Sequence, residues 1–373
     1  MIEALRGVEL SAYTTLGLGG PAQAFVPAGT EQDLIDAVRL ADRAGEPVLL
    51  IGGGSNLVIS DAGFPGTVVH VSTRGITYID VGDGVLDVTV AAGADWDHVV
   101  ASTIAEGLAG LEPLSGIPGR AGASPIQNVG AYGREVAEVI IQVRVYDRQD
   151  DRVKSIPNEF CRFAYRTSLF KSGRPESLVS RPDAASPRAA GQPRYVVLDV
   201  TFRLRRQSLS APVRYAELAA ELGVELGEQA VVSEVRAAVI KIRSRKGMVL
   251  NPGDPDTRSA GSFFTNPVIT ADAFAAVEKA AAARDAAAVP HYPAGEGKVK
   301  VPAAWLIEHA GFAKGYGAPA PARVSSKHTL ALVNAGDATT SDLLTLAREI
   351  VTGVRAAYGV TLTPEPTLIG VTL

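Results

Sequence analysis

The 373-residue chain has one cysteine, Cys161, and lacks any long apolar run. A lone cysteine excludes an internal disulfide framework and is typical of a reducing compartment. No segment approaches the ~20 consecutive apolar residues of a membrane helix, and the N-terminal MIEALRGVEL is too acidic for a signal peptide. The net charge of −4 argues against a broad surface for nucleic acid or acidic membranes. We therefore expect a cytoplasmic globular protein that binds no nucleic acid and does not insert into a membrane.

The first part of the chain has the pattern of a small β-α-β unit. Thr14–Pro27 is rich in glycine and leads into a helix, for which Thr30 is the expected N-cap. Val48–Ile51 is predicted to be a short buried strand ending in Gly52–Asn56, GGGSN. A second apolar run, Val68–Val71, completes the unit.

The middle of the chain predicts an α+β region with a largely antiparallel sheet. Tyr78–Val81 and Val85–Val90 flank a Gly-Asp-Gly turn signal, and Asp95 is expected to cap a helix that ends near Glu106. Further strands are predicted at Val139–Tyr146 and, from its clean alternation, at Val196–Leu204. Between them, Ser172–Arg194 has no periodicity and is interpreted as a mobile surface insertion.

The last third predicts helices and short strands. Apolar residues at helical spacing predict a helix over Glu228–Lys246, and its last turns are basic, as suits a helix C-terminus. The remaining predicted elements are helices near Ala271–Arg284, Pro302–Ala310 and Ser341–Tyr358, and strands at Leu330–Asn334, Val360–Leu362 and Leu368–Leu373.

Two glycine-rich segments have more small residues than packing explains. Gly52–Asn56 follows a strand, and its closely spaced N–H groups form the kind of concave loop that binds phosphate. It matches neither the Walker pattern nor the dinucleotide fingerprint, so an ordinary turn remains an alternative. Leu114–Gly133 contains five glycines and one charged residue, Arg120, for which the sequence suggests no role. Together the two segments suggest the two walls of a site for a flat, phosphate-bearing cofactor such as a flavin.

Six motifs in order extend this interpretation to nearly the whole chain: GGGSN, IPGRAGASPIQNVGAYG, CRFAYRTSLFK, AGSFFTNP, AAWLIE and LTPEPTLIG. Together they resemble the UDP-N-acetylenolpyruvoylglucosamine reductase (UDP-N-acetylmuramate dehydrogenase) family. The resemblance implies an α+β protein: a FAD-binding fold of the p-cresol methylhydroxylase/vanillyl-alcohol oxidase type with two subdomains, plus an α+β substrate-binding domain. The expected boundaries are 1–70 with 359–373, 71–248, and 249–358. YRTSLF and the tyrosine in PVRYAEL resemble the subtype with a substrate-covering tyrosine loop.

The family's reaction is the NADPH-dependent, FAD-mediated reduction of the enolpyruvyl ether of UDP-N-acetylglucosamine to UDP-N-acetylmuramate, a peptidoglycan precursor. The resemblance implies hydride delivery from the flavin N5 and a proton from Ser262. It assigns Arg166 and Glu365 to stabilising the enolate, a role that suits a guanidinium with fixed charge. The family usually has an acidic residue where this chain has Thr167, so an ion pair made by that acid is absent or replaced here.

Further site residues are carried over by the same resemblance. The expected substrate-binding residues are Tyr165, Tyr215, Lys246, Asn266 and Lys314. The expected cofactor-binding residues are Gly52, Gly53, Gly54, Ser55, Asn56, Gly93, Ser115, Gly116, Ile117, Gly119, Gly122 and Ala123. No histidine lies in a flavin-linking or metal motif, so we expect noncovalent FAD, NADPH as co-substrate, no metal, and a monomer.

Two other functions remain open from the sequence. A flavin oxidase or dehydrogenase of the same fold acting on an alcohol or amine would have unrelated substrate-domain motifs and often a flavin-linking histidine. A non-enzymatic flavin or nucleotide-sugar binding protein would not need Ser262, Arg166 and Glu365 together.

Overall fold

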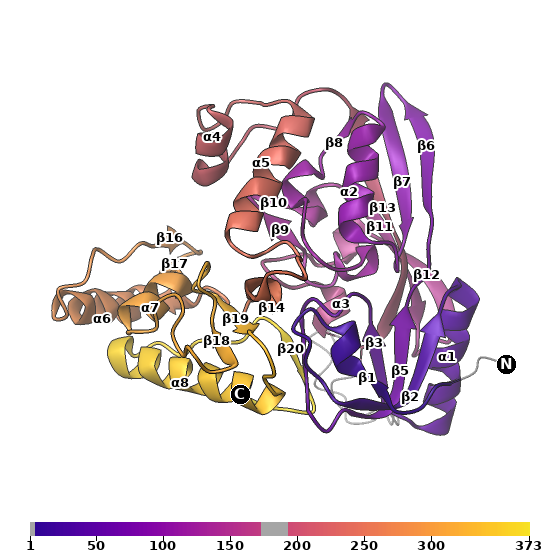
Figure 1. The fold of residues 1–373 in the computed structure, drawn as a ribbon. Coiled ribbons are helices and arrows are strands. Elements are labelled where there is room, and N and C mark those ends of the chain that lie inside the picture. The colour runs from indigo at the N-terminus through magenta and orange to yellow at the C-terminus, as the bar shows by residue number, and fades with distance from the viewer. Residues whose placement is uncertain (1–3, 173–192) are drawn as a thin grey trace. The chain divides into compact units, whose positions relative to one another are not determined.

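The computed structural model describes residues 4–172 and 193–373 (Figure 1). The chain folds into two compact units that are not contiguous in sequence. The first unit comprises 1–8, 22–53 and 65–244, and the second comprises 9–21, 54–64 and 245–373. Of the predicted insertion Ser172–Arg194, residues 173–192 lie outside the described part of the chain.

The β-α-β unit predicted near the N-terminus is present in the first unit. Helix α1 (Glu31–Ala44) begins with a reciprocal cap, in which the Thr30 hydroxyl accepts from Asp33 N–H at 3.1 Å and the Asp33 carboxylate from Thr30 N–H at 3.0 Å. The neighbouring sheet has the order β1 (Val8–Glu9), β2 (Pro21–Ala28), β5 (Phe64–Val71), β3 (Val48–Ile51), with β3 and β5 parallel. Strand β2 went unnoticed in the sequence, because its small residues blur the alternation of buried and exposed positions.

The antiparallel sheet predicted for the middle of the chain is confirmed. Its order is β12 (Arg152–Pro157), β11 (Ile140–Asp147), β13 (Tyr195–Arg206), β7 (Val85–Ala91), β6 (Ile76–Gly82), with β8 (Leu108–Ala109) also on β13. Asp95 caps α2 (Trp96–Ala105) as expected, accepting from His98 N–H at 3.1 Å. The buried faces of α1, α2 and this sheet contribute to one apolar core.

Smaller elements complete the first unit. The short strands β9 (Gly130–Ala131) and β10 (Arg134–Glu135) form a hairpin, and the helices are α3 (Leu169–Ser172), α4 (Ala216–Leu222) and α5 (Val232–Arg245). The predicted start of α5 at Glu228 is wrong. The Glu228 carbonyl accepts from Val213 N–H at 2.8 Å, and the Ala230 carbonyl accepts from Ser210 N–H at 2.8 Å. These residues therefore pair with the segment around 210–213 before the helix begins.

The second unit has its own apolar core beneath three helices, α6 (Ala271–Ala282), α7 (Ala303–His309) and α8 (Thr340–Tyr358). One three-stranded sheet of this unit has the order β14 (Ser259–Ser262), β19 (Ala331–Asn334), β18 (Ala322–Val324). Another has the order β15 (Val268–Thr270), β17 (Lys298–Lys300), β16 (Tyr292–Pro293). A parallel pair joins β4 (Leu57–Ile59) to β20 (Thr367–Ile369). The strand predicted at Val360–Leu362 is absent from the described chain, and the last strand is shorter than Leu368–Leu373 because it pairs with the three residues of β4.

Candidate flavin site

The two glycine segments meet each other in the first unit. A Cβ added to Gly53 would lie 2.9 Å from the Cα of Gly119, and one added to Gly52 would lie 3.0 Å from Cγ of Arg120. Only residues without side chains allow two backbones to approach this closely. The sequence placed these segments some sixty residues apart, and the fold brings the start of the first against the middle of the second.

The remainder of the first segment belongs to the second unit. Gly54 has a positive φ of 57°, and a Cβ there would lie 1.9 Å from the carbonyl oxygen of Tyr13. The Asn56 amide donates to the carbonyl of Glu365 at 3.4 Å, and the Asn56 carbonyl accepts from Thr367 N–H at 2.9 Å. The end of GGGSN, which includes Ser55, therefore lies beside the segment that carries a predicted catalytic glutamate.

The second glycine segment is held by the N-terminal turn of α2. Gly116 N–H donates to the Asp97 carboxylate at 2.6 Å, and that carboxylate also receives both terminal nitrogens of Arg236 at 2.7 and 2.8 Å. The hydrogen bonds from Arg236 hold the pKa of Asp97 below its ordinary value. Trp96 N–H donates to the Gly119 carbonyl at 3.1 Å. An ion pair between α2 and α5 thus fixes the loop in which a flavin is expected.

Several of the predicted cofactor contacts use their polar groups inside the protein. Gly93 N–H donates to the Thr73 hydroxyl at 3.0 Å, and Gly122 N–H to the Ala92 carbonyl at 2.8 Å. The buried Ser115 hydroxyl donates to the Glu112 carbonyl at 2.7 Å. The Ser115 and Gly122 bonds hold the second glycine segment in place, and the Gly93 bond joins its own loop to Thr73. Ala123 N–H likewise donates to the Arg120 carbonyl at 3.0 Å, and Ile117 packs against the core of the first unit.

Arg166 lies at the tip of a tight turn that rests on the second glycine segment. Ala164 and Thr167 exchange two hydrogen bonds of 3.1 Å, and Arg166 has a φ of 54°, an uncommon value for a residue with a side chain. The guanidinium carbon lies 5.6 Å from the ring centroid of Tyr165, which is 43% exposed. The Asn128 amide donates to the Ala164 carbonyl at 3.3 Å, which joins this turn to the QN of the second segment.

Tyr215 contacts a residue that the sequence interpretation missed. Its ring packs edge-on against Tyr132 at 5.4 Å and 86°. Tyr132 (φ 51°) and Gly133 (φ 80°) form the two-residue turn between β9 and β10, in which both positions are left-handed. A tyrosine is unusual at a left-handed position. The tyrosine before the last glycine of GAYG was therefore the sequence signal that could have identified Tyr132 as a special residue. Burial raises the pKa of Tyr132 to about 12, so its phenol stays neutral at physiological pH.

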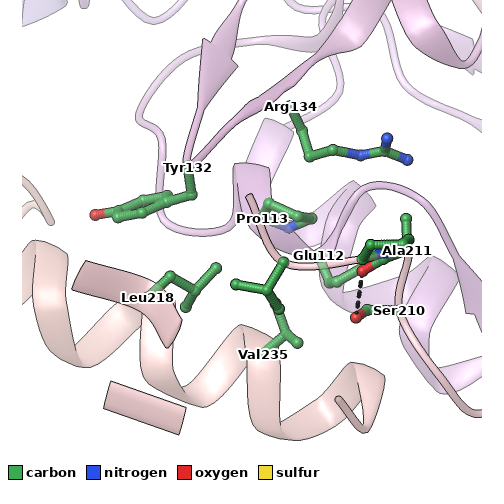
Figure 2. Close-up of a pocket in the computed structure, with 10 residues that line it drawn as sticks. Glu112, Pro113, Tyr132, Arg134, Ser210, Ala211, Leu218 and Val235 are labelled. Atoms are coloured by element: carbon green, nitrogen blue, oxygen red, sulfur yellow. Dashed lines mark hydrogen bonds between the residues drawn. The ribbon is translucent and has the colours of Figure 1, made fainter. Parts of the chain in front are cut away.

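A small cavity lies behind Tyr132 in the first unit, lined by residues such as Glu112, Ser210, Leu218 and Val235 (Figure 2). It offers about 10 Å³ to water, room for about one molecule. This cavity is too small for a nucleotide sugar. Tyr132 itself forms part of its lining.

Ser262 and Glu365 are brought close together in the second unit. Ser262 ends β14, and the following residues pair antiparallel with the chain near Pro364. Glu365 N–H donates to the Phe263 carbonyl at 2.9 Å, and Thr265 N–H donates to the Thr363 carbonyl at 3.1 Å. The rings of Phe263 and Phe264 are fully buried, which anchors this pairing in the core.

The other predicted substrate residues of the second unit have different surroundings. The Asn266 side-chain oxygen accepts from Ala303 N–H at 2.9 Å, so it caps the start of α7. Lys246 is half-buried and Lys314 is exposed. Tyr165, Arg166 and Tyr215 belong to the first unit, while Ser262 and Glu365 belong to the second.

Within the described residues, no helix combines the length and apolar character of a membrane span. In the same part of the chain, no cluster of three or more histidine, cysteine, aspartate or glutamate side chains is arranged to hold a metal ion.

Comparison with known proteins matches both parts of the chain to described families. Residues 22–156 match the family described as "FAD binding domain", and residues 254–369 match "UDP-N-acetylenolpyruvoylglucosamine reductase, C-terminal domain". The chain is 53% identical over 370 residues to the UDP-N-acetylenolpyruvoylglucosamine reductase of Thermobifida fusca, covering 99% of this chain and 98% of the relative. It is 52% identical to that of Streptomyces coelicolor, covering 100% and 92%. A crystal structure of the Thermus caldophilus reductase (MurB) superposes with a TM-score of 0.63 at 24% identity, covering 99% and 100%.

The chain is a FAD-dependent oxidoreductase with a FAD-binding domain and a second, α+β domain. The close approach of the Gly52–Gly53 and Gly119 backbones in the first unit fits such a cofactor, because glycine-rich loops present N–H groups to phosphate with no Cβ in the way. The chain belongs to the UDP-N-acetylenolpyruvoylglucosamine reductase family.

Proposed function

We propose that this protein reduces the enolpyruvyl ether of UDP-N-acetylglucosamine to UDP-N-acetylmuramate, with noncovalent FAD and with NADPH as the reductant. The observation that carries the proposal is the pairing of the Ser262 and Glu365 segments in the unit that matches the family's C-terminal domain. The protein acts in peptidoglycan precursor synthesis, as a cytoplasmic monomer. Its organisation into 1–70 with 359–373, 71–248, and 249–358 belongs to the same proposal.

The reaction adds a hydride to one carbon of the double bond and a proton to the other. FAD, when bound, passes on the hydride that NADPH supplies. The protein must then stabilise the negative charge that develops next to the substrate carboxylate and deliver a proton to the same carbon.

Arg166 suits the first task. A guanidinium offers paired donors to a carboxylate and carries the positive charge that an enolate needs. The turn that presents it is fixed by two backbone hydrogen bonds and by Asn128, so little ordering remains to be done when substrate binds. The aromatic ring of Tyr165 beside the guanidinium adds a favourable contact for its charge.

Ser262 suits the second task, because an enolate is basic enough to take a proton from a hydroxyl. Its strand end is anchored by the buried Phe263, whose carbonyl accepts from Glu365 N–H. The same contact positions Glu365, which we propose orients the substrate beside the enolate. Asn56 supports that segment from the end of the first glycine loop.

Tyr215 supports the subtype with a covering tyrosine. It directly precedes α4, is 42% exposed, and rests on Tyr132 rather than in the core. An exposed aromatic ring held from one side is suited to close over the diphosphate of a UDP-sugar. Lys246, Asn266 and Lys314 are proposed to contact the UDP or sugar.

The test separates the two half-reactions by stopped-flow absorbance of the flavin. In a Ser262→Ala variant we expect NADPH to bleach the flavin at a near-normal rate, while its reoxidation by the enolpyruvyl substrate slows by roughly two to four orders of magnitude. The matched control is Thr265→Ala, three residues further along, whose hydroxyl makes one long hydrogen bond of 3.4 Å. Both half-reactions should survive in it. Rapid reoxidation of the Ser262→Ala enzyme would remove Ser262 as proton donor.

The whole proposal is tested on the unmodified protein. A purified sample should show a flavin spectrum and should oxidise NADPH faster when the enolpyruvyl substrate is present. Equal NADPH oxidation without that substrate would favour an oxidase, and binding without turnover would favour a non-enzymatic relative.

A further inference from the structure

Arg120 is a charged residue placed where the two glycine segments meet. It follows Gly119, whose backbone contacts Gly53, and its own Cβ and Cγ lie against Gly52. A backbone bridge to Asp95 fixes its position, and a short 3-10 turn, Ala121–Ala123, begins directly after it. The stem of the side chain therefore packs where the loops meet, and the guanidinium extends from there toward Asp95.

The positive charge of Arg120 is poorly compensated within the described residues. Its ion-pair partner is Asp95, with a nitrogen-oxygen distance of 3.8 Å and side-chain exposures of 32% and 56%. An ion pair this long and this exposed compensates the charge only weakly. The Asp95 carboxylate also accepts from His98 N–H at the start of α2. The other acid of this helix start, Asp97, is paired with Arg236.

One donor of this guanidinium has no acceptor in the described structure. Arg120 Nε is buried and makes no hydrogen bond there. A buried donor left without an acceptor is costly, and native proteins rarely keep one. The nearby ring of His70 neither adds to this positive charge nor offers a negative one. Burial lowers the pKa of His70, and the charge of Arg120 lowers it further, so the imidazole is neutral at physiological pH.

A buried N–H without an acceptor and a weakly compensated charge, on a residue where two glycine loops meet, fit an anionic ligand. We propose that Arg120 binds the diphosphate of FAD. This inference rests on the proposed use of FAD and adds a residue that binds the cofactor. The backbone N–H groups of the glycine loops interact with the diphosphate as dipoles, without formal charge. Arg120 supplies a full charge and a fork of donors.

The test measures affinity by titrating apoprotein with FAD and, separately, with riboflavin, which has the same ring system but no phosphate. Quenching of flavin fluorescence reports binding without any turnover. In Arg120→Ala we expect FAD to bind about 10- to 100-fold more weakly, the loss typical of one charge-assisted contact, and riboflavin to bind as in the unmodified protein. Arg120→Lys should fall between them, because it keeps the charge and loses the fork.

A second variant guards against misfolding. Asp95→Asn keeps an effective N-cap for α2 and removes the competing carboxylate, so FAD should bind more tightly than in the unmodified protein. Weaker FAD binding in that variant would overturn the inference. In Arg120→Ala, unchanged FAD affinity, or an equal loss for FAD and riboflavin, would overturn it as well. Failure of the unmodified apoprotein to bind FAD would instead remove the proposed function itself.

Discussion

A methyl group added at Gly53 tests whether contact between the two glycine loops matters. The Cβ of a Gly53→Ala variant would lie 2.9 Å from the Cα of Gly119. Carbon atoms pack best at about 3.5–4.0 Å, so the backbones must separate by roughly 0.6 Å or more. Overpacking of this kind costs about 1–3 kcal/mol. No flexible side chain can absorb it, because the opposing atoms belong to the backbone.

The cost must show in stability, in FAD affinity, or in both. If the loops stay together, the melting temperature of the apoprotein should fall by about 2–10 °C. If they open, the dissociation constant for FAD should rise by about 5- to 150-fold. Differential scanning calorimetry and FAD titration of the same sample measure the two.

A matched control carries the same change where there is space. Gly29 lies in the same unit and has no atom within 4 Å of an added Cβ. Gly29→Ala should leave FAD affinity unchanged and keep or slightly raise the melting temperature. A Gly53→Ala protein that matches this control in both measurements would refute the close contact of the loops.

Two further outcomes follow from buried groups of the first unit. The pKa of His70 is lowered, mainly by burial, so the unfolded chain binds a proton at this residue before the folded chain does as pH falls below about 6.5. The free energy of unfolding, measured by urea unfolding at each pH, should therefore fall between pH 7 and 5. It should fall less steeply in a His70→Gln variant, which lacks the titrating group. Equal slopes would contradict this. Burial raises the pKa of the Cys161 thiol to about 12, so little reactive thiolate is present at pH 8. Ellman's reagent at that pH should label no thiol in the native protein and one thiol in guanidinium chloride. Rapid labelling of the native protein would contradict the burial of Cys161.

The elements with strong local signals were predictable. Thr30 and Asp95 cap their helices as expected, because capping depends on residues within three positions of each other. The turn at Asp83 likewise depends on residues that adopt positive φ, 52° here. By contrast, the true start of α5 depends on Glu228 pairing with Val213, a contact that helical periodicity does not reveal.

The sequence suggests candidate residues for the site, but it does not predict how they are arranged. The family motifs identify Ser262 and Glu365, but the antiparallel pairing that joins their segments spans a hundred residues of chain. The packing of Tyr132 on Tyr215 and the position of Arg120 against Gly52 are long-range contacts as well. Such contacts depend on how whole elements pack, so no local pattern predicts them.

The interleaving of the two units along the chain has a consequence for synthesis. Residues 9–21 and 54–64 leave the ribosome early, yet the unit to which they belong is completed only by residues 245–373. These early segments must therefore wait while the first unit, whose last residue is 244, is still being made. Because domains fold as units during synthesis, a chain truncated near residue 244 would retain two segments without their partners. Cutting the protein at one point therefore cannot separate its two units.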